Sequence, residues 1–398
     1  MKITALGGCG DMGRYAVRTA IGFDFVDEVV IADLDAGRAA AFAAECGDKA
    51  RPKAVNAEDE ASLDAAIAGS DVVLNTIGPF YRFGVPILRA SIRNGAHYLD
   101  ICDDWEPTLE MLELGPDAEA AGVTAIVGVG ASPGVSNLLA VKAMEGLDRV
   151  DTLVTGWSIG SDPASGAAAE REPSAALVHW IHQCSGAIRV ARNGSMTDLP
   201  PIEEVTVDYP GIGKGRAWTV GHPEAVTLPR HRQDLRNSCN VMVGSPVRIE
   251  IMRGLAARVD SGELTPYEAA KRLLAGDVSH GAVTPSPFDA VRLPPLFAHA
   301  TGVRGGVPVR VGAMVLALPP TGMGGSTGVP LAVGLSQFAA GRITRPGVFA
   351  PEDVIDPDSF FDELARHCKP ARTGVDEMVR VTAVPSELRA RRGSLVSE

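Results

Sequence analysis

The chain has 398 residues, of which 45% are hydrophobic and 22% are charged, and its formal net charge is −12. This length suits two domains, or one domain with a large insertion, and the composition is that of an ordinary globular protein. The acidic balance argues against nucleic acid as a partner, because phosphate binding needs a basic surface. No run approaches the roughly 20 apolar residues that cross a bilayer, so we expect no membrane partner.

The cysteines and the start of the chain favour the cytoplasm. Six cysteines are scattered without C-x-x-C pairs: Cys9, Cys46, Cys102, Cys184, Cys239 and Cys368. That pattern is typical of reduced thiols rather than of a disulfide framework or a zinc site. The first predicted strand begins at once, with no charged and apolar leader, so we expect no signal peptide.

Residues 3–21 predict a strand, a glycine turn and a helix. The turn has the spacing G-x-G-x-x-G, which is weak evidence alone. Gly8 permits the tight bend, Gly10 lets a pyrophosphate approach the backbone, and Gly13 lets the helix pack closely on the strand. The free N–H groups at the helix start favour a phosphate. We therefore assign cofactor contacts to Gly8, Cys9, Gly10, Asp11, Met12 and Gly13.

A second apolar run, residues 28–32, ends at Asp33, twenty positions after Gly13. An acid at this place binds the adenosine ribose hydroxyls, and its carboxylate repels a 2′-phosphate. We therefore expect NAD as the cofactor, while Arg14 and Arg38 are near enough to leave NADP open. The alternative is a strand-turn-helix unit that binds no ligand.

Strands and helices alternate up to residue 130. The predicted strands are residues 3–6, 28–32, 50–55, 71–77, 97–100 and 123–129, and the predicted helices are 14–21, 34–46, 62–68, 85–94 and 108–121. This alternation predicts an α/β domain, a Rossmann-type doubly wound parallel sheet with helices on both faces. Ligands in such folds lie at the carboxyl ends of the strands.

Polar residues follow several of these strand ends. We assign cofactor contacts near the nicotinamide to Asn75, Thr76, Gly78, Pro79 and Phe80. Asp100 and Asp103 follow the fifth strand and are candidates for holding a substrate ammonium or moving a proton, and Tyr98 is a candidate for orienting either group. The alternative for the two aspartates is a solvated acidic turn that caps the next helix. The alternative for Tyr98 is a half-buried tyrosine of the core.

The regular alternation of predicted strands and helices ends at about residue 130. Residues 162–169 read as a loop, and residues 296–301 and 307–318 flank a glycine-containing turn, which predicts an antiparallel hairpin. We expect a second, inserted α+β domain at 131–325 that binds substrate and dimerises. A glycine-rich stretch at 321–328 reads as a hinge. It is followed by helices at 331–340 and 358–367, a strand at 376–384 and a charged tail.

With these residues laid out, the chain resembles the saccharopine dehydrogenase family, and it is closest in pattern to lysine 6-dehydrogenase-type members. The resembling segments are the glycine turn, residues 75–80, 95–100 and 130–137, and, in character, 221–229 and 341–352. The resemblance implies NAD(P)-dependent oxidoreduction at a carbon–nitrogen centre and a homodimer. It also implies that residues 326–398 return to the nucleotide-binding domain, residues 1–130.

Further substrate contacts are expected around the second domain. Ser132 and Asn137 follow the last Rossmann strand, although saccharopine reductases carry an acid where this chain has Ser132. His222 and Glu224 lie in a Gly-His-Pro-Glu loop and are catalytic candidates. Arg230 is a candidate for a substrate carboxylate, and a solvated basic turn is the alternative. His179 and His182 lack a third ligand, so we expect no metal.

The primary hypothesis is therefore a cytoplasmic NAD(P)-dependent dehydrogenase or reductase. Its substrate would be a small amino-acid-like molecule or the corresponding imine. Two alternatives stay open: a catalytically silent dinucleotide-binding regulatory or assembly protein, and a reductase of a C=C or C=O bond.

Overall fold

The computed structural model describes residues 1–159 and 172–386, which form two compact units. The first unit contains Met1–Leu138 and Leu316–Arg380, and the second contains Leu139–Val315 and the chain from Val381 onward. The chain enters the second unit within helix α7 (Val135–Met144). The expected loop at 162–169 and most of the expected charged tail lie outside the described residues.

A seven-stranded sheet forms the centre of the first unit, and every neighbouring pair in it is parallel. Its strands are β1 (Lys2–Leu6), β2 (Glu28–Asp33), β3 (Ala50–Ala54), β4 (Val72–Asn75), β5 (His97–Asp100), β6 (Thr124–Ile126) and β15 (Gly347–Phe349). The order is β15-β6-β5-β4-β1-β2-β3, so the direction of winding reverses between β1 and β4. The predicted doubly wound, Rossmann-type fold is confirmed, and β15 is a seventh strand that the sequence pattern did not predict.

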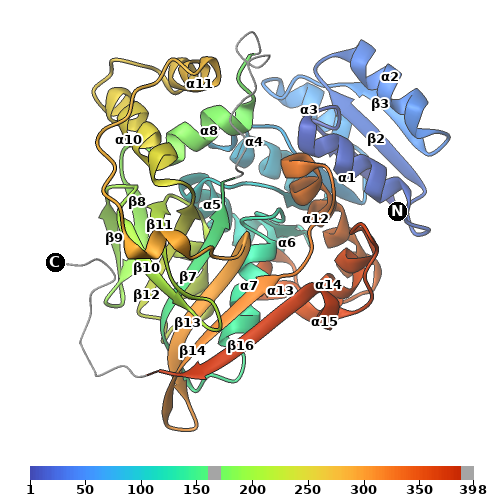
Figure 1. Ribbon diagram of the computed structural model, residues 1–398. Coiled ribbons are helices and arrows are strands. Elements are labelled where there is room, and N and C mark those ends of the chain that lie inside the picture. The colour runs from blue at the N-terminus through green and yellow to red at the C-terminus, as the bar shows by residue number, and fades with distance from the viewer. Residues whose placement is uncertain (160–171, 387–398) are drawn as a thin grey trace. The chain divides into compact units, whose positions relative to one another are not determined.

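Helices cover both faces of this sheet (Figure 1). They are α1 (Asp11–Ile21), α2 (Ala36–Cys46), α3 (Glu60–Ile67), α4 (Phe80–Arg93), α5 (Trp105–Leu112), α6 (Gly115–Ala120), α12 (Gly322–Ala339), α13 (Pro351–Val354), α14 (Pro357–Arg366) and α15 (Val375–Met378). Apolar side chains of α3, α4, α5 and α6 share one core with Tyr98. The single helix predicted at 108–121 is two helices, because Gly115 and Pro116 begin a new one.

The expected hinge at 321–328 is wrong, because these residues form the first turns of α12. This helix runs beside α1 (Figure 1). A Cβ at Gly328 would lie 2.1 Å from the carbonyl oxygen of Met12, and one at Gly324 would lie 2.7 Å from the ring of Tyr15. The glycines therefore serve close packing between two helices rather than backbone flexibility.

The second unit is built on a mixed nine-stranded sheet. Strands β7 and β12 pair in parallel, whereas β10–β11, β11–β12, β8–β12, β13–β14, β7–β13 and β8–β9 are antiparallel pairs. Its strands are β7 (Arg149–Ser158), β8 (Ile188–Arg192), β9 (Ser195–Leu199), β10 (Glu204–Tyr209), β11 (Gly213–Val220), β12 (Asn237–Val243), β13 (Leu296–Arg304), β14 (Val307–Val315) and β16 (Val379–Pro385). Strands β13 and β14 form the predicted hairpin, with Gly305 and Gly306 both at positive φ in its turn. The second domain is thus α+β, as predicted.

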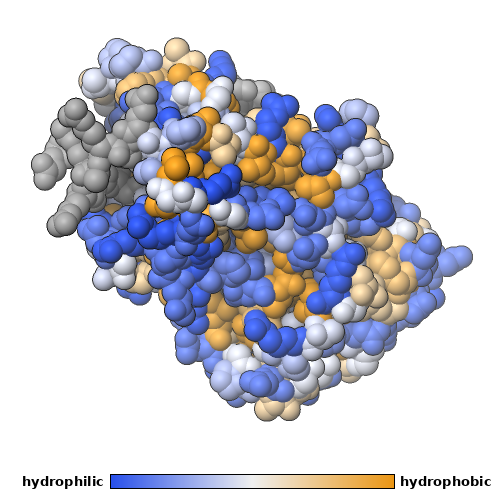
Figure 2. Space-filling model, turned by 90° about the horizontal axis from the view of Figure 1, so that it is seen from below, coloured by the Kyte–Doolittle hydropathy of each residue, from blue (hydrophilic) through white to orange (hydrophobic). Residues whose placement is uncertain are grey.

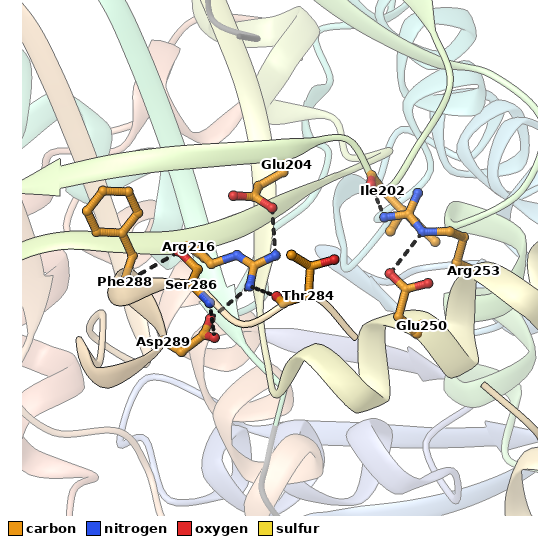
Figure 3. Close-up of polar contacts among 9 residues, drawn as sticks. All are labelled: Ile202, Glu204, Arg216, Glu250, Arg253, Thr284, Ser286, Phe288 and Asp289. Atoms are coloured by element: carbon orange, nitrogen blue, oxygen red, sulfur yellow. Dashed lines mark hydrogen bonds and ion pairs between the residues drawn. The ribbon is translucent and has the colours of Figure 1, made fainter. Parts of the chain in front are cut away.

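Helices α8 (Ala175–Gln183), α9 (Glu224–His231), α10 (Pro246–Asp260) and α11 (Pro266–Ala275) complete this unit, with a short 3₁₀ helix, η2 (Pro287–Ala290). Apolar residues of α8, α10 and α11 pack over β11 and β12. Arg216 of β11 fastens the segment before β13 to the sheet, since its guanidinium binds Glu204, Asp289 and the carbonyl oxygen of Thr284 (Figure 3).

Polar residues separate the apolar ones into small groups over the face drawn in Figure 2. The exposed large hydrophobic residues are dispersed along the chain, with Leu34, Tyr81, Met323 and Val307 the most exposed. None of the helices in the described residues combines the length and the hydropathy of a membrane span.

Candidate active site

The glycine turn joins β1 to α1 in the first unit. A Cβ at Gly13 would lie 2.3 Å from the carbonyl oxygen of Gly7, so the helix can approach the turn only because residue 13 is glycine. Gly10 is the N-cap of α1, and no side chain caps the helix start. In this turn it is Gly7, at a φ of 71°, that takes the left-handed conformation. The helix thus presents uncapped amides, as a pyrophosphate site requires.

The carboxyl end of β2 supplies Asp33 close to this turn. Asp33 is half-buried, and its carboxylate interacts with the buried thiol of Cys9. Burial, and then the charge of Asp33, raise the pKa of Cys9 to about 11, so this thiol stays protonated at neutral pH. Arg38 donates to the carbonyl oxygen of Cys9 at 3.0 Å. A carboxylate and a guanidinium therefore both lie where the adenosine ribose would bind.

The carboxyl end of β4 is tied to the glycine turn. Thr76 Oγ1 donates to the carbonyl oxygens of Leu6 and Gly7 at 3.0 and 3.1 Å. Beyond it, Gly78 is exposed, and a Cβ at this residue would meet no atom within 4 Å. Pro79 is the N-cap of α4, and Phe80 is buried in the core below. Gly78 therefore borders open space beside the turn, which suits the predicted nicotinamide half of a dinucleotide.

A buried hydrogen-bond network joins the ends of β4, β5 and β6. Asn75 Nδ2 donates to the hydroxyl of Tyr98 at 3.0 Å, and that hydroxyl donates to Asp100 Oδ2 at 2.8 Å. Asp100 Oδ1 accepts from the backbone N–H groups of Cys102 at 3.0 Å and Gly128 at 2.7 Å. Burial raises the pKa of Asp100 to about 6, against these hydrogen bonds, which favour the charged form.

This network changes the roles that the sequence suggested for its members. Tyr98 and Asp100 are fully buried, and burial raises the pKa of Tyr98 well above its usual value. Their polar atoms bind neighbouring loops, so they position the site. Asp103 is half-buried on the loop that Asp100 holds, between the buried residues Cys102 and Asp104. Of the two catalytic carboxylates that we predicted in the first unit, Asp103 is the accessible one.

The loop after β6 is held from the far end of the chain. Asn137 Oδ1 accepts from the N–H of Gly134 at 2.8 Å, and Asn137 Nδ2 donates to Glu352 Oε2 at 2.7 Å. Ser132 is half-buried in the same loop. Sequence reasoning missed Glu352, a buried acid at the start of α13. The signal was present: Glu352 follows the carboxyl end of β15, as the other candidates follow their strands, but β15 itself was not recognised.

In the second unit, His222 and Glu224 follow the end of β11 and are buried. His222 Nδ1 lies 3.4 Å from Glu224 Oε2, and the imidazole ring packs against Trp157, with ring centroids 5.8 Å apart. Trp180 of α8 packs against Trp157 in turn, at 6.5 Å. The ring nitrogens Nε1 of Trp157, Nε1 of Trp180 and Nδ1 of His222 are buried, and no hydrogen bond satisfies them within the described residues.

Such unsatisfied buried polar atoms are rare, so these three ring nitrogens are candidates for hydrogen bonds to a ligand. The two tryptophans were not among the predicted site residues, because an isolated tryptophan on a strand or helix carries no spacing signal.

Arg230 does not belong to this group. It lines a different depression, together with Arg149 at the start of β7, whereas Trp157 lies near the other end of that strand. Eight residues of strand separate the two positions by about 26 Å. The described residues contain no cluster of three His, Cys, Asp or Glu side chains that would hold a metal ion.

Comparison with known proteins agrees with this geometry. Residues 3–126 match the family model described as "Saccharopine dehydrogenase NADP binding domain". A saccharopine dehydrogenase [NADP(+), L-glutamate-forming] from Pyricularia oryzae is 31% identical over 94 residues, 24% of this chain and 20% of that protein. The enzyme of the same description from Saccharomyces cerevisiae is 28% identical over 148 residues, 37% of this chain and 31% of that protein.

The resemblance to the saccharopine dehydrogenase family is confirmed. The match spans only a fifth to a third of the length of these curated relatives. At the level of structure, an apo saccharopine dehydrogenase (L-Glu forming) from Saccharomyces cerevisiae superposes with a TM-score of 0.65 at 15% identity. That alignment covers 96% of this chain and 99% of the yeast chain, so the two share their fold through both units.

The comparisons support a pyridine-nucleotide-binding domain. The names of the family model and of both curated relatives specify NADP, so the comparisons lean towards NADP rather than the NAD that we predicted from Asp33.

Proposed function

We propose that this protein is an NAD(P)-dependent oxidoreductase that acts on a carbon–nitrogen bond of an amino acid or of the corresponding imine. The observation that carries the proposal is the glycine turn. Its uncapped helix start, its required glycine at position 13 and the ribose-binding side chains after β2 all lie at the carboxyl edge of the parallel sheet. The saccharopine dehydrogenase names of the relatives suggest the carbon–nitrogen substrate.

A bound pyridine nucleotide supplies or accepts a hydride at its nicotinamide ring. In the oxidative direction the substrate carbon loses that hydride, its nitrogen loses a proton, and an imine remains. The amides at the start of α1 hold the pyrophosphate. We assign the proton to Asp103, since a carboxylate of ordinary exposure can take and release it. Asp100 and Tyr98 hold the loop that carries Asp103.

In the second unit, taken by itself, we assign the binding of a carboxylate-bearing molecule to the indole N–H groups of Trp157 and Trp180 and to His222. A carboxylate of an amino acid is the natural ligand for several buried donors that have no acceptor among the described residues.

For the cofactor, we propose that the site takes NADP as well as NAD. Arg38 is exposed and lies against the glycine turn through its bond to Cys9, which places a cation beside the ribose. Asp33 keeps the carboxylate that binds the hydroxyls of NAD and opposes the phosphate of NADP. The preference then depends on the balance between these two side chains.

The test combines binding with turnover. Gly10→Val should weaken the affinity for both nucleotides at least tenfold, because the added side chain occupies the pyrophosphate position. At Gly10 a Cβ would contact only the carbonyl oxygen of Gly7, at 3.2 Å, so the fold should survive. The matched control is Gly254→Val on the exposed face of α10, which should leave affinity unchanged. Affinity is measured by titration of the intrinsic or nucleotide fluorescence.

Turnover is followed through the absorbance of the reduced nicotinamide. One arm offers a panel of amino acids with NAD or NADP, and the other offers 2-oxo acids plus amines with the reduced nucleotides. Asp103→Asn should abolish turnover while nucleotide binding is retained. Unchanged affinity in Gly10→Val would overturn the dinucleotide site. Normal binding without turnover across the panel would overturn the enzymatic assignment and favour a regulatory protein.

A further inference from the structure

The second unit contains a cavity of about 570 Å³ that the proposed reaction does not use. It is lined by Arg149, Ala191, Gly194, Met196, Pro229, Arg230, Gln233, Asp234, Leu235 and Arg236. These residues come from the start of β7, the β8–β9 hairpin, the end of α9 and the segment before β12. The parallel strands β7 and β12 both begin here, so their first residues bring basic side chains to one edge of the sheet.

The residues that line this cavity carry an excess of positive charge. Arg149 is paired with Asp151, at 2.8 and 3.1 Å. The single lining carboxylate, Asp234, is held by Arg232 at 2.6 Å and by the N–H of Val150 at 2.9 Å. Burial alone would raise the pKa of Asp234, but these hydrogen bonds outweigh it and hold that pKa below its usual value. Asp234 is therefore charged and already compensated.

Two guanidinium groups that line the cavity have no carboxylate partner in the part of the chain that the structure describes. Arg236 donates to the carbonyl oxygen of Asn193 at 3.3 Å, which neutralises no charge. No hydrogen bond or ion pair of the described residues engages Arg230, which lies in the last turn of α9. The remaining lining includes two apolar side chains, the buried Leu235 and the exposed Met196. The cavity thus combines two available cations with an apolar surface.

We propose that this cavity binds a small organic dianion, in which two anionic groups are carried on a short apolar body. Arginine is the side chain best shaped for this, because its planar fork binds carboxylate and phosphate oxygens through two parallel N–H donors. In a chain of net charge −12, a local basic cavity also concentrates anions that the rest of the surface repels. The shared chemistry covers dicarboxylates and phosphate monoesters.

This site differs from the donor group at Trp157. Arg149 and Trp157 stand near opposite ends of β7, so a ligand of the cavity is not the molecule that meets the indole N–H groups. The inference therefore goes beyond the proposed oxidoreductase activity and stands whether or not that activity is found.

The experiment is isothermal titration calorimetry of the full-length protein. Glutarate serves as the dicarboxylate, glycerol 3-phosphate as the phosphate monoester and butyrate as the monoanion, all at constant ionic strength and with saturating NADP. Saturation with NADP prevents glycerol 3-phosphate from binding at the glycine turn. We expect at least one dianion to bind with a Kd below about 1 mM and butyrate to bind at least tenfold more weakly.

Substitutions then locate the binding. Arg230→Gln and Arg236→Gln should each weaken the dianion at least tenfold, and circular dichroism should show both variants folded. The matched control is Arg292→Gln, an exposed arginine of the same unit outside the cavity, which should bind as the wild type does. The two ligand arms show whether carboxylate or phosphate is preferred. No binding of either dianion, equal binding of butyrate, or equal weakening by Arg292→Gln would each overturn the proposal.

Discussion

Asp100 carries the most consequential single charge of the first unit. Its carboxylate accepts a hydrogen bond from Tyr98 and two from backbone N–H groups of separate loops, although no part of it is exposed. Burial disfavours the charge while the three donors favour it, and burial wins, because the pKa rises to about 6. Asp100 thus holds loops 101–104 and 127–134 together, and its buried carboxyl group titrates near pH 6.

This balance predicts a pH-dependent contribution to stability. The folded pKa of about 6 exceeds the ordinary value of 3.8, so the folded chain holds a proton that the unfolded chain releases between these values. The contribution is fully present below about pH 3.8 and is lost as the pH rises through 6, with a limit of about 3 kcal/mol.

Asp100→Asn removes this titration. The difference in unfolding free energy, wild type minus variant, should therefore fall between pH 4 and about 6.5, as measured by urea denaturation at each pH. Other carboxylates contribute equally to both proteins and cancel in the difference. A difference that rises with pH, or that stays flat, would contradict the prediction.

The side chains of Asp33 and Arg38 allow a second prediction, which concerns the preference between NAD and NADP. Asp33→Asn removes the charge that opposes a 2′-phosphate and should raise the affinity for NADP relative to NAD about tenfold. Arg38→Gln should shift the ratio the other way, because it removes the cation beside the ribose. Competitive binding of the two nucleotides gives the ratio directly, and no shift in either variant would remove both side chains from the ribose site.

Among the elements, the contact between α1 and α12 decides how the start of the nucleotide-binding domain is held. Gly324 and Gly328 place the α12 backbone against Tyr15 and Met12 of the helix at whose N-terminus we propose the pyrophosphate binds. Further along α12, a Cβ at Gly334 would lie 2.5 Å from Leu99, so the same helix also covers β5 closely. Packing of α12 therefore sets the position of α1 relative to the sheet.

Gly328→Ala tests this contact. The new Cβ would lie 2.1 Å from a backbone oxygen that cannot move independently, so we expect a loss of about 2–3 kcal/mol in unfolding free energy. The control is Gly254→Ala in α10, where the nearest atom is 3.8 Å away. An alanine in that exposed helix interior should instead stabilise the protein by up to about 1 kcal/mol. Thermal or urea denaturation of both variants shows whether the change in unfolding free energy is negative for Gly328→Ala and positive for Gly254→Ala.

At the scale of the whole molecule, the first unit is assembled from both ends of the chain. The second unit, an insertion, separates Leu138 from Leu316. The later segment contributes α12, an edge strand that pairs with β6 and the acid Glu352, which binds Asn137 across 215 positions of sequence. We therefore expect nucleotide binding to depend on residues that lie more than 300 positions from the glycine turn.

A chain ended after Val315 should consequently fail to bind either nucleotide, although it retains every residue of the glycine turn, β2 and β4. It should also expose the apolar surface of α1 and β5 and unfold without a cooperative transition. Supplying residues 316–398 as a separate fragment should restore binding in part. Full affinity in the shortened chain, measured by the same fluorescence titration, would show that the returning segment is dispensable.

The sequence alone determined the Rossmann-type sheet and the glycine turn, because each β-turn-α unit is encoded in consecutive residues with a regular apolar period. It also singled out Asp33, Asn75 and Asp100 as candidates, and each is the last residue of its strand. Only the tertiary structure showed that Asp100 is a buried anchor, that β15 extends the sheet and that Glu352 joins the site.

The tertiary structure likewise made the glycines of α12 a packing surface and placed Arg230 beside Arg149 in one cavity. The physical reason is common to all of these results. They depend on which segments meet across long stretches of chain, and contacts of that kind leave no periodic mark on the residues that make them.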